Sequence, residues 1–188
     1  NNNISANVNY TSTLDTLGQS ISIDFDYSKF RQPQLLTATN TSKYNNLNQS
    51  LGQNIIFKNQ ASQLISISSV KLDYSKPVSS SVSFETGSKF YLLETQSNYS
   101  FFNYSSDSYI EDVSKSNEFN YHESNLALYG NFNKDFNDKW YLQLGSRNEN
   151  TFLKGKSLTG NVNLKPYYTR FFPTLFLQYI RNENNQYN

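Results

Sequence analysis

Polar and apolar residues alternate with a period of two in short stretches that recur along the whole chain. In the clearest stretch, Val82, Phe84 and Phe90 occupy alternate positions, and small or charged residues occupy the positions between them. Successive side chains of a β-strand point to opposite faces of its sheet, so this period predicts strands with one apolar and one polar face. The predicted strands lie at 4–11, 20–28, 64–74, 81–90, 123–132, 140–149 and about 171–179.

The alternation changes phase within the third predicted strand. Val70 and Leu72 share one face, whereas Ile65 and Ile67 fall on the other. A β-bulge near residues 68–69 would produce this change, because the extra residue reverses the facing of every later side chain. A change of environment above a membrane would explain it without a bulge. The sequence leaves both explanations open.

The connections between the predicted strands alternate in length. Short ones lie at 13–19, 75–80, 134–138 and 182–186, and long polar ones lie at 31–54, 95–117 and 152–165. In outer-membrane β-barrels, short turns face the periplasm and long loops face outward. The pattern therefore predicts an all-β fold, namely an antiparallel transmembrane β-barrel segment with short periplasmic turns and long extracellular loops. About seven strands are too few, and odd in number, to close a bacterial barrel alone.

The composition favours this fold over a disordered chain. Only 36% of the residues are hydrophobic, yet 16% are aromatic, and disordered chains are poor in aromatic residues. Rings near strand ends, such as Phe25, Tyr27 and Trp140, are typical of the girdles at membrane interfaces. A soluble β-sandwich alternates in the same way and stays an alternative, although it needs two well-filled inner faces.

Charge and residue content exclude several other classes of protein and site. The net charge is +1 and no basic stripe is present, so the sequence does not predict nucleic-acid binding. The chain has no cysteine, which excludes disulfides and thiolate metal sites, and we expect no cofactor. The sequence contains no run of about 18 apolar residues, so it does not predict a transmembrane helix. Because there is no methionine and no leader at Asn1, we expect a piece of a longer, processed protein.

The period assigns the side chains of each predicted strand to one of two faces. In a barrel, the polar face lines the lumen and the apolar face contacts lipid. The predicted lumen-facing residues are Lys71, Asp73, Glu85, Lys89, Glu123, Gln143, Arg147 and Glu149. The predicted lipid-facing or girdle residues are Phe25, Tyr27, Leu72, Tyr74, Phe84, Leu126, Leu128, Phe132, Trp140, Leu142, Leu144, Leu175 and Leu177.

The charges of the polar face predict ion pairs between neighbouring strands, which would form a structural wall. Contact with a substrate or with a plug is the alternative use of these charges. Gly87 and Gly145 occupy corresponding places on their strands, and we expect them to relieve crowding. His122 is the only histidine, and Ser124 shares its face, but no nucleophile elbow or paired acid accompanies them. The sequence therefore predicts no enzyme and places His122 at a strand end near the membrane interface.

Four segments, taken together, resemble a known family. They are 70–77 (VKLDYSKP) with 84–89 (FETGSK), 119–123 (FNYHE) with 127–129 (ALY), 140–151 (WYLQLGSRNENT) and 172–175 (FPTL). In order and spacing they are similar to the Bacteroidetes outer membrane beta-barrel family that is related to TonB-dependent receptors. The resemblance covers about residues 64–180.

The resemblance implies an outer-membrane location and a barrel of about 22 strands closed by an N-terminal plug. Many members also carry a regulatory domain before the plug. This chain shows no plug, regulatory domain, TonB box or terminal strands, so we expect residues 1–188 to form part of one barrel domain.

The function implied by the resemblance is that of a TonB-dependent-receptor-like transporter that imports a bulky nutrient. The implied partners are outer-membrane lipid, the remainder of the barrel and its plug, TonB and a surface lipoprotein. One alternative is an outer-membrane structural or assembly barrel that binds partner proteins without transport. The other is a soluble secreted β-sandwich adhesin.

Overall fold

The computed structural model describes residues 2–40, 55–137, 139–157, 159, 162–182 and 185–187, and every regular element among them is a β-strand. The strands are β1 (Asn2–Thr13), β2 (Ser20–Asn40), β3 (Ile55–Ser79), β4 (Val82–Ser105), β5 (Ser108–Glu111), β6 (Asn117–Asn137), β7 (Trp140–Ser157), β8 (Asn163–Leu164), β9 (Tyr167–Asn182) and β10 (Asn185–Tyr187). Within these ranges, no helix is long and apolar enough to cross a membrane.

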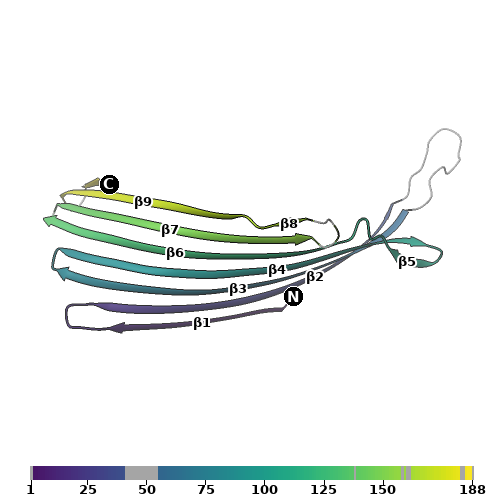
Figure 1. The fold of residues 1–188 in the computed structure, drawn as a ribbon, viewed down its shortest axis with the longest axis horizontal. Coiled ribbons are helices and arrows are strands. Elements are labelled where there is room, and N and C mark those ends of the chain that lie inside the picture. Colours follow the sequence, from purple (N-terminus) through teal and green to yellow (C-terminus); the bar gives the residue numbers. More distant parts are fainter. Residues whose placement is uncertain are drawn as a thin grey trace.

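The strands form one ten-stranded antiparallel sheet in the order β1-β2-β3-β4-β6-β7-β9-β10. The short strands β5 and β8 pair at the sides of β4 and β7. The path keeps the order of the chain, with only the short β5 and β8 between its neighbours, so the sheet is built from hairpins (Figure 1). Over the described residues, β1 does not pair with β10, and the sheet is open. The prediction of an antiparallel barrel segment is confirmed, and its seven long strands are the seven predicted ones.

The short connections lie together at one end of the sheet, at the left in Figure 1. The tightest hairpins link β3 to β4 and β6 to β7, and a longer turn links β1 to β2. In that turn, the Asp15 carboxylate accepts hydrogen bonds from the backbone N–H groups of Leu17 and Gln19, at 2.9 and 2.8 Å. Gly18 adopts a φ of 91°, a backbone conformation that residues other than glycine rarely adopt. The sequence therefore encodes this turn directly.

The predicted long loops are shorter than the sequence indicated, because paired strands extend into them. The pairs between β2 and β3 continue to Thr39 and Ile56, and β4 runs to Ser105. A further hairpin, with positive φ at Ser106 and Asp107, joins β4 to β5. Backbone hydrogen bonds need no apolar side chain, so strands that leave an apolar environment stay paired while their hydrophobic period fades. Residues 41–54 of the first predicted loop lie outside the described residues.

Of the two explanations for the change of phase in the third strand, the β-bulge near residues 68–69 is wrong. The pairing between β2 and β3 has no register shift. It begins with Ser20 opposite Ser75 and continues without interruption beyond Ile67. The change in phase is therefore a change in which face carries the apolar side chains, and of the two explanations only the change of environment fits the structure.

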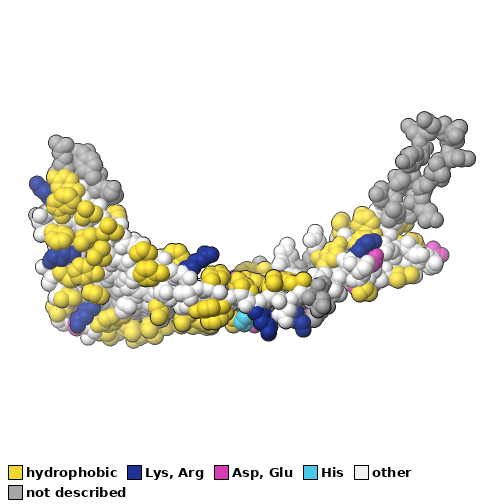
Figure 2. Space-filling view, turned by 45° about the horizontal axis from the view of Figure 1, so that its top comes forward, with side chains coloured by type: hydrophobic (Ala, Val, Ile, Leu, Met, Phe, Trp, Pro, Cys, Tyr) yellow, Lys and Arg dark blue, Asp and Glu magenta, His cyan; other side chains and the backbone are white. Residues whose placement is uncertain are grey.

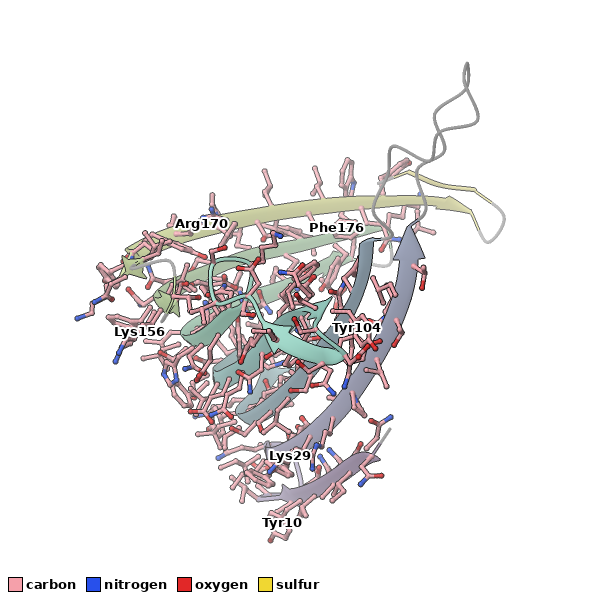
Figure 3. All side chains as sticks on the ribbon, turned by 90° about the vertical axis from the view of Figure 1, so that its right-hand side faces the viewer. Tyr10, Lys29, Tyr104, Lys156, Arg170 and Phe176 are labelled. Carbon is pink, nitrogen blue, oxygen red and sulfur yellow. The ribbon has the colours of Figure 1, made fainter. Side chains whose placement is uncertain are left out.

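The two faces of the sheet differ in burial. Buried side chains of the sheet belong to the polar face, as Asn125, Ala127 and Thr151 show, and Ala127 is the only buried hydrophobic residue among those described. Large apolar side chains of the other face are exposed, with Leu128 at 52% and Leu175 at 71% of their full accessible area. Figure 3 looks along the strands at the curled sheet, and Figure 2 shows apolar side chains spread over its surface. This burial is the reverse of that in a soluble domain.

A β-sandwich would cover its apolar face with a second sheet. The described strands form one sheet, and its apolar face has no covering layer in this structure. The β-sandwich alternative is therefore wrong.

Candidate functional site

The strand register decides which side chains share a face, because directly paired residues of antiparallel strands project to the same side. One such row contains Lys71, Lys89, Ala127 and Glu149. The residues predicted to face a lumen all lie on the face of this row: Lys71, Asp73, Glu85, Lys89, Glu123, Gln143, Arg147 and Glu149. Those predicted to face lipid all lie on the opposite face: Phe25, Tyr27, Leu72, Tyr74, Phe84, Leu126, Leu128, Phe132, Trp140, Leu142, Leu144, Leu175 and Leu177.

A continuous set of polar contacts crosses the polar face from β3 to β7. The Lys71 ammonium lies 2.6 Å from the Asp73 carboxylate, which accepts a hydrogen bond from the Tyr129 hydroxyl. The Arg147 guanidinium carbon lies 5.5 Å from the centre of the Tyr129 ring. Arg147 Nε in turn lies 2.6 Å from Glu149 Oε1. These five residues form one cluster, which we call the wall cluster.

Gly87 makes this cluster possible. It lies on β4, directly between Asp73 of β3 and Tyr129 of β6 in the register. A Cβ atom at Gly87 would lie 2.6 Å from Tyr129 Cζ and Oη and from the Leu72 carbonyl oxygen, which is closer than real Cβ contacts come. The Tyr129 ring therefore crosses β4 at the one place where no side chain stands in its way.

Gly145 has a similar role on β7, where the Asn131 side chain lies over it. The expectation that both glycines relieve crowding is confirmed. The neighbours that need the space are side chains of the same sheet.

The prediction of ion pairs between strands is wrong for this face. Among the described residues of this face, the two ion pairs each join residues i and i+2 of one strand, Lys71 with Asp73 and Arg147 with Glu149. The register does place opposite charges across strands, with Asp24 of β2 opposite Lys71 and Arg170 of β9 opposite Glu149. The contacts at ion-pair distance are nevertheless the two within single strands.

Glu123 lies in a second polar group, further from the short turns. Its carboxylate accepts hydrogen bonds from the hydroxyls of Tyr91 on β4 and Tyr121 on β6. Glu85 is exposed, and Lys89 and Gln143 are half-buried on the same face. Within the described ranges, no three His, Cys, Asp or Glu residues are grouped so that they could hold a metal ion.

Sequence reasoning missed the part played by the tyrosines. It assigned aromatic residues mainly to membrane girdles, yet Tyr91, Tyr121 and Tyr129 project from the polar face and bind its carboxylates. A signal was available, because Tyr121 and Tyr129 stand an even number of positions from Glu123 within one strand, as Tyr91 does from Lys89. Girdle-type packing does occur on the apolar face, where the Trp140 and Tyr179 rings lie 4.7 Å apart.

Of three comparisons with known proteins, two give matches. Residues 12–188 match the model of the outer membrane protein beta-barrel family. Comparison with curated proteins gives no match.

Among solved structures, unliganded ferric citrate transporter FecA is similar at a TM-score of 0.67, with 12% identity over 96% of this chain and 25% of that chain. The ferric yersiniabactin uptake receptor FyuA from Yersinia pestis is similar at 0.57, with 12% identity over 96% of this chain and 26% of that chain. A pyoverdine complex of P. aeruginosa FpvA is similar at a TM-score of 0.56, with 14% identity over 96% of this chain and 24% of that chain.

At these identities the likeness to solved structures shows the fold alone, and the chain spans about a quarter of their length. The family model covers nearly the whole chain and agrees with the antiparallel sheet and its exposed apolar face. The chain belongs to the outer membrane protein beta-barrel family, and its location is the bacterial outer membrane.

Proposed function

We propose that the chain forms part of the wall of a TonB-dependent-receptor-like transporter, with its polar face toward the lumen and its apolar face toward lipid. One observation carries this proposal: buried positions such as Asn125 and Thr151 are polar, whereas Leu128 and Leu175 are exposed. In water, the exposed apolar face would be strongly unfavourable. In an outer membrane, lipid covers that face, and the polar face borders the lumen.

The width of the uncharged band supports this facing. On the apolar face of β6, the positions between His122 and Lys134 carry no charge, from Ser124 to Phe132. A tilted transmembrane β-strand needs about 9–11 residues to cross the hydrocarbon core. The band has the length that a membrane-spanning strand requires.

The open sheet supports a larger barrel. Since edge strands left unpaired in lipid would be costly, we propose that further strands join β1 and β10 and that a plug occupies the lumen. In this proposal residues 1–188 belong to a single barrel domain, and the partners are lipid, the remaining strands, the plug, TonB and a surface lipoprotein. Two of the similar structures are named as a ferric citrate transporter and a ferric yersiniabactin uptake receptor. By analogy with them, the complete barrel imports a bulky nutrient.

A structural or assembly role is the second candidate function, and one observation favours it. In the wall cluster, Asp73 and Glu149 bind partners within the sheet, which is typical of a wall that maintains its shape. A strain that lacks the complete barrel separates the two functions. A transporter predicts loss of energy-dependent uptake of a labelled large nutrient, whereas an assembly role predicts normal uptake and loss of a partner protein from the outer membrane.

The facing is tested separately with two adjacent positions of β7. The chain has no cysteine, so Leu144→Cys and Gln143→Cys each introduce one labelling site into this segment. In the complete barrel, reconstituted in a bilayer, a fluorophore at residue 144 should be quenched by brominated lipid. The same fluorophore at residue 143 should be quenched by water-soluble iodide. Equal quenching by brominated lipid at both positions would contradict the proposed facing.

A further inference from the structure

A second set of charged residues lies on the apolar face, beyond the uncharged band. Lys29, Glu94, His122 and Lys154 occupy one row of the register, joined through Ser66 of β3. The next row outward contains Arg31, Leu64, Gln96, Asn120 and Lys156. We call Lys29, Arg31, Lys154 and Lys156 the basic belt. It lies toward the end of the sheet that carries the long connections.

The basic belt has more positive charge than its neighbours balance. Its side chains are exposed, and among the described residues no carboxylate lies within ion-pair distance of them. Glu94, the one carboxylate of the two rows, lies 3.4 Å from His122 Nδ1. Figure 2 shows this single histidine with Lys or Arg side chains beside it, next to the apolar surface. The belt therefore presents several cations that lack an acidic partner.

A shallow depression of about 500 Å³ lies along the belt. Lys29, His122, Lys154 and Lys156 line it, together with Asn120 and with Glu94, whose carboxylate lies beside His122. Ammonium, amide and imidazole groups all donate hydrogen bonds to phosphate oxygens, and ammonium groups also attract the phosphate charge. The depression thus combines the groups that would bind an anion with several acceptor oxygens.

The position of the belt identifies what brings that anion. Directly inward from the belt, the same face carries the row of Tyr27, Leu92 and Phe152, where the uncharged band begins. Basic side chains at this boundary between an apolar and a polar surface attract anionic lipid headgroups. We propose that the basic belt binds the phosphorylated headgroup of an anionic lipid in the outer leaflet, whose acyl chains lie along the band. This inference rests on the proposed facing.

A pair of matched double variants tests the proposal in the complete barrel. K154Q/K156Q removes two charges of the belt, and K76Q/K134Q removes two charges of the same face at the opposite edge of the band. The probe is diphosphorylated lipid A, titrated into barrel purified in neutral detergent, and native mass spectrometry counts the bound lipid. We expect K154Q/K156Q to weaken binding about 30-fold, because each basic side chain near an anionic membrane surface contributes roughly fivefold. K76Q/K134Q should bind as the unmodified barrel does.

Equal binding by both variants would overturn the proposal, and so would an unmodified barrel that does not prefer lipid A to phosphatidylcholine. If a polyglutamate peptide binds the belt and lipid A does not, the occupant is an acidic partner protein and the lipid proposal is wrong. The fluorophores at residues 143 and 144 separate this failure from failure of the facing. If brominated lipid quenches the fluorophore at residue 144 and K154Q/K156Q binds lipid A as the unmodified barrel does, the belt proposal is wrong and the proposed facing stands.

Discussion

Replacing Gly87 with alanine is expected to disrupt the wall cluster, because it places a methyl group under the Tyr129 ring. The added Cβ would lie 2.6 Å from Tyr129 Cζ and Oη, and 2.6 Å from the backbone oxygen of Leu72. Contacts this short force the ring away from β4. The Tyr129 hydroxyl then loses its hydrogen bond to Asp73.

The expected cost is the sum of two effects. A hydrogen bond to a charged group contributes about 1.5–3 kcal/mol, and overpacking at a closely packed site costs about 1–3 kcal/mol. Asp73 keeps its ion pair with Lys71 at 2.6 Å, which limits the loss. We therefore expect Gly87→Ala to lower the free energy of unfolding by about 3 kcal/mol.

Gly130→Ala is the matched control. Gly130 lies on the neighbouring strand β6. A Cβ atom at Gly130 would lie 3.6 Å from its nearest neighbour, the Glu85 carbonyl oxygen, which is an ordinary van der Waals contact. Urea unfolding of the complete barrel in detergent micelles, followed by tryptophan fluorescence, gives both free energies. Gly130→Ala should change stability by less than about 1 kcal/mol. If Gly87→Ala costs no more than Gly130→Ala, the proposed role of Gly87 is wrong.

Three further predictions concern the membrane band, the wall cluster and the loop outside the sheet. Leu128→Arg, at the middle of the uncharged band, should reduce stability in lipid by about 2–4 kcal/mol, measured by urea titration in vesicles, whereas Gln143→Arg on the polar face should be tolerated. Tyr129→Phe should cost about 1.5–3 kcal/mol, and the same change in an Asp73→Asn background should cost clearly less; equal costs would refute the coupling. The Asp112 carboxyl, between β5 and β6, has its pKa lowered from 3.8 to about 2 by hydrogen bonds from a neighbouring serine hydroxyl and lysine ammonium. Ionised Asp112 stabilises the loop through these hydrogen bonds, so the stabilisation should be complete above pH 3.8 and lost as the pH falls through about 2. Hydrogen exchange of the loop amides should show this pH dependence, and Asp112→Asn should abolish it.

The hydrophobic period was enough to predict the seven long strands and the two faces of the sheet. In residues 123–132, for example, Leu126, Leu128 and Phe132 stand at alternate positions, and the register places them on one face. The period failed where strands continue beyond the apolar band. Residues 95–105 of β4 show no such alternation, since Phe101 and Phe102 stand side by side among polar residues, so their pairing depends on backbone hydrogen bonds that leave no mark in the sequence.

The wall cluster was only partly predictable. The sequence showed that Lys71, Asp73, Arg147 and Glu149 share a face, but not how they pair. Pairing depends on the register between strands, which places Tyr129 opposite both Gly87 and Arg147. The recurrence of glycine on the polar face indicated crowding, yet it did not reveal which ring fills the space.

The central claim is that the polar face borders the lumen and the apolar face borders lipid. A nitroxide scan along β6, from His122 to Lys134 in the complete barrel reconstituted in a bilayer, tests this claim most directly. The account predicts that accessibility to oxygen, which concentrates in lipid, peaks at every second residue from Ser124 to Phe132 and falls toward both ends of the scan. Accessibility to a water-soluble nickel complex should peak at the residues between them. A scan without a period of two, or one in which oxygen reaches Asn125 and Tyr129 better than Leu126 and Leu128, would contradict the account.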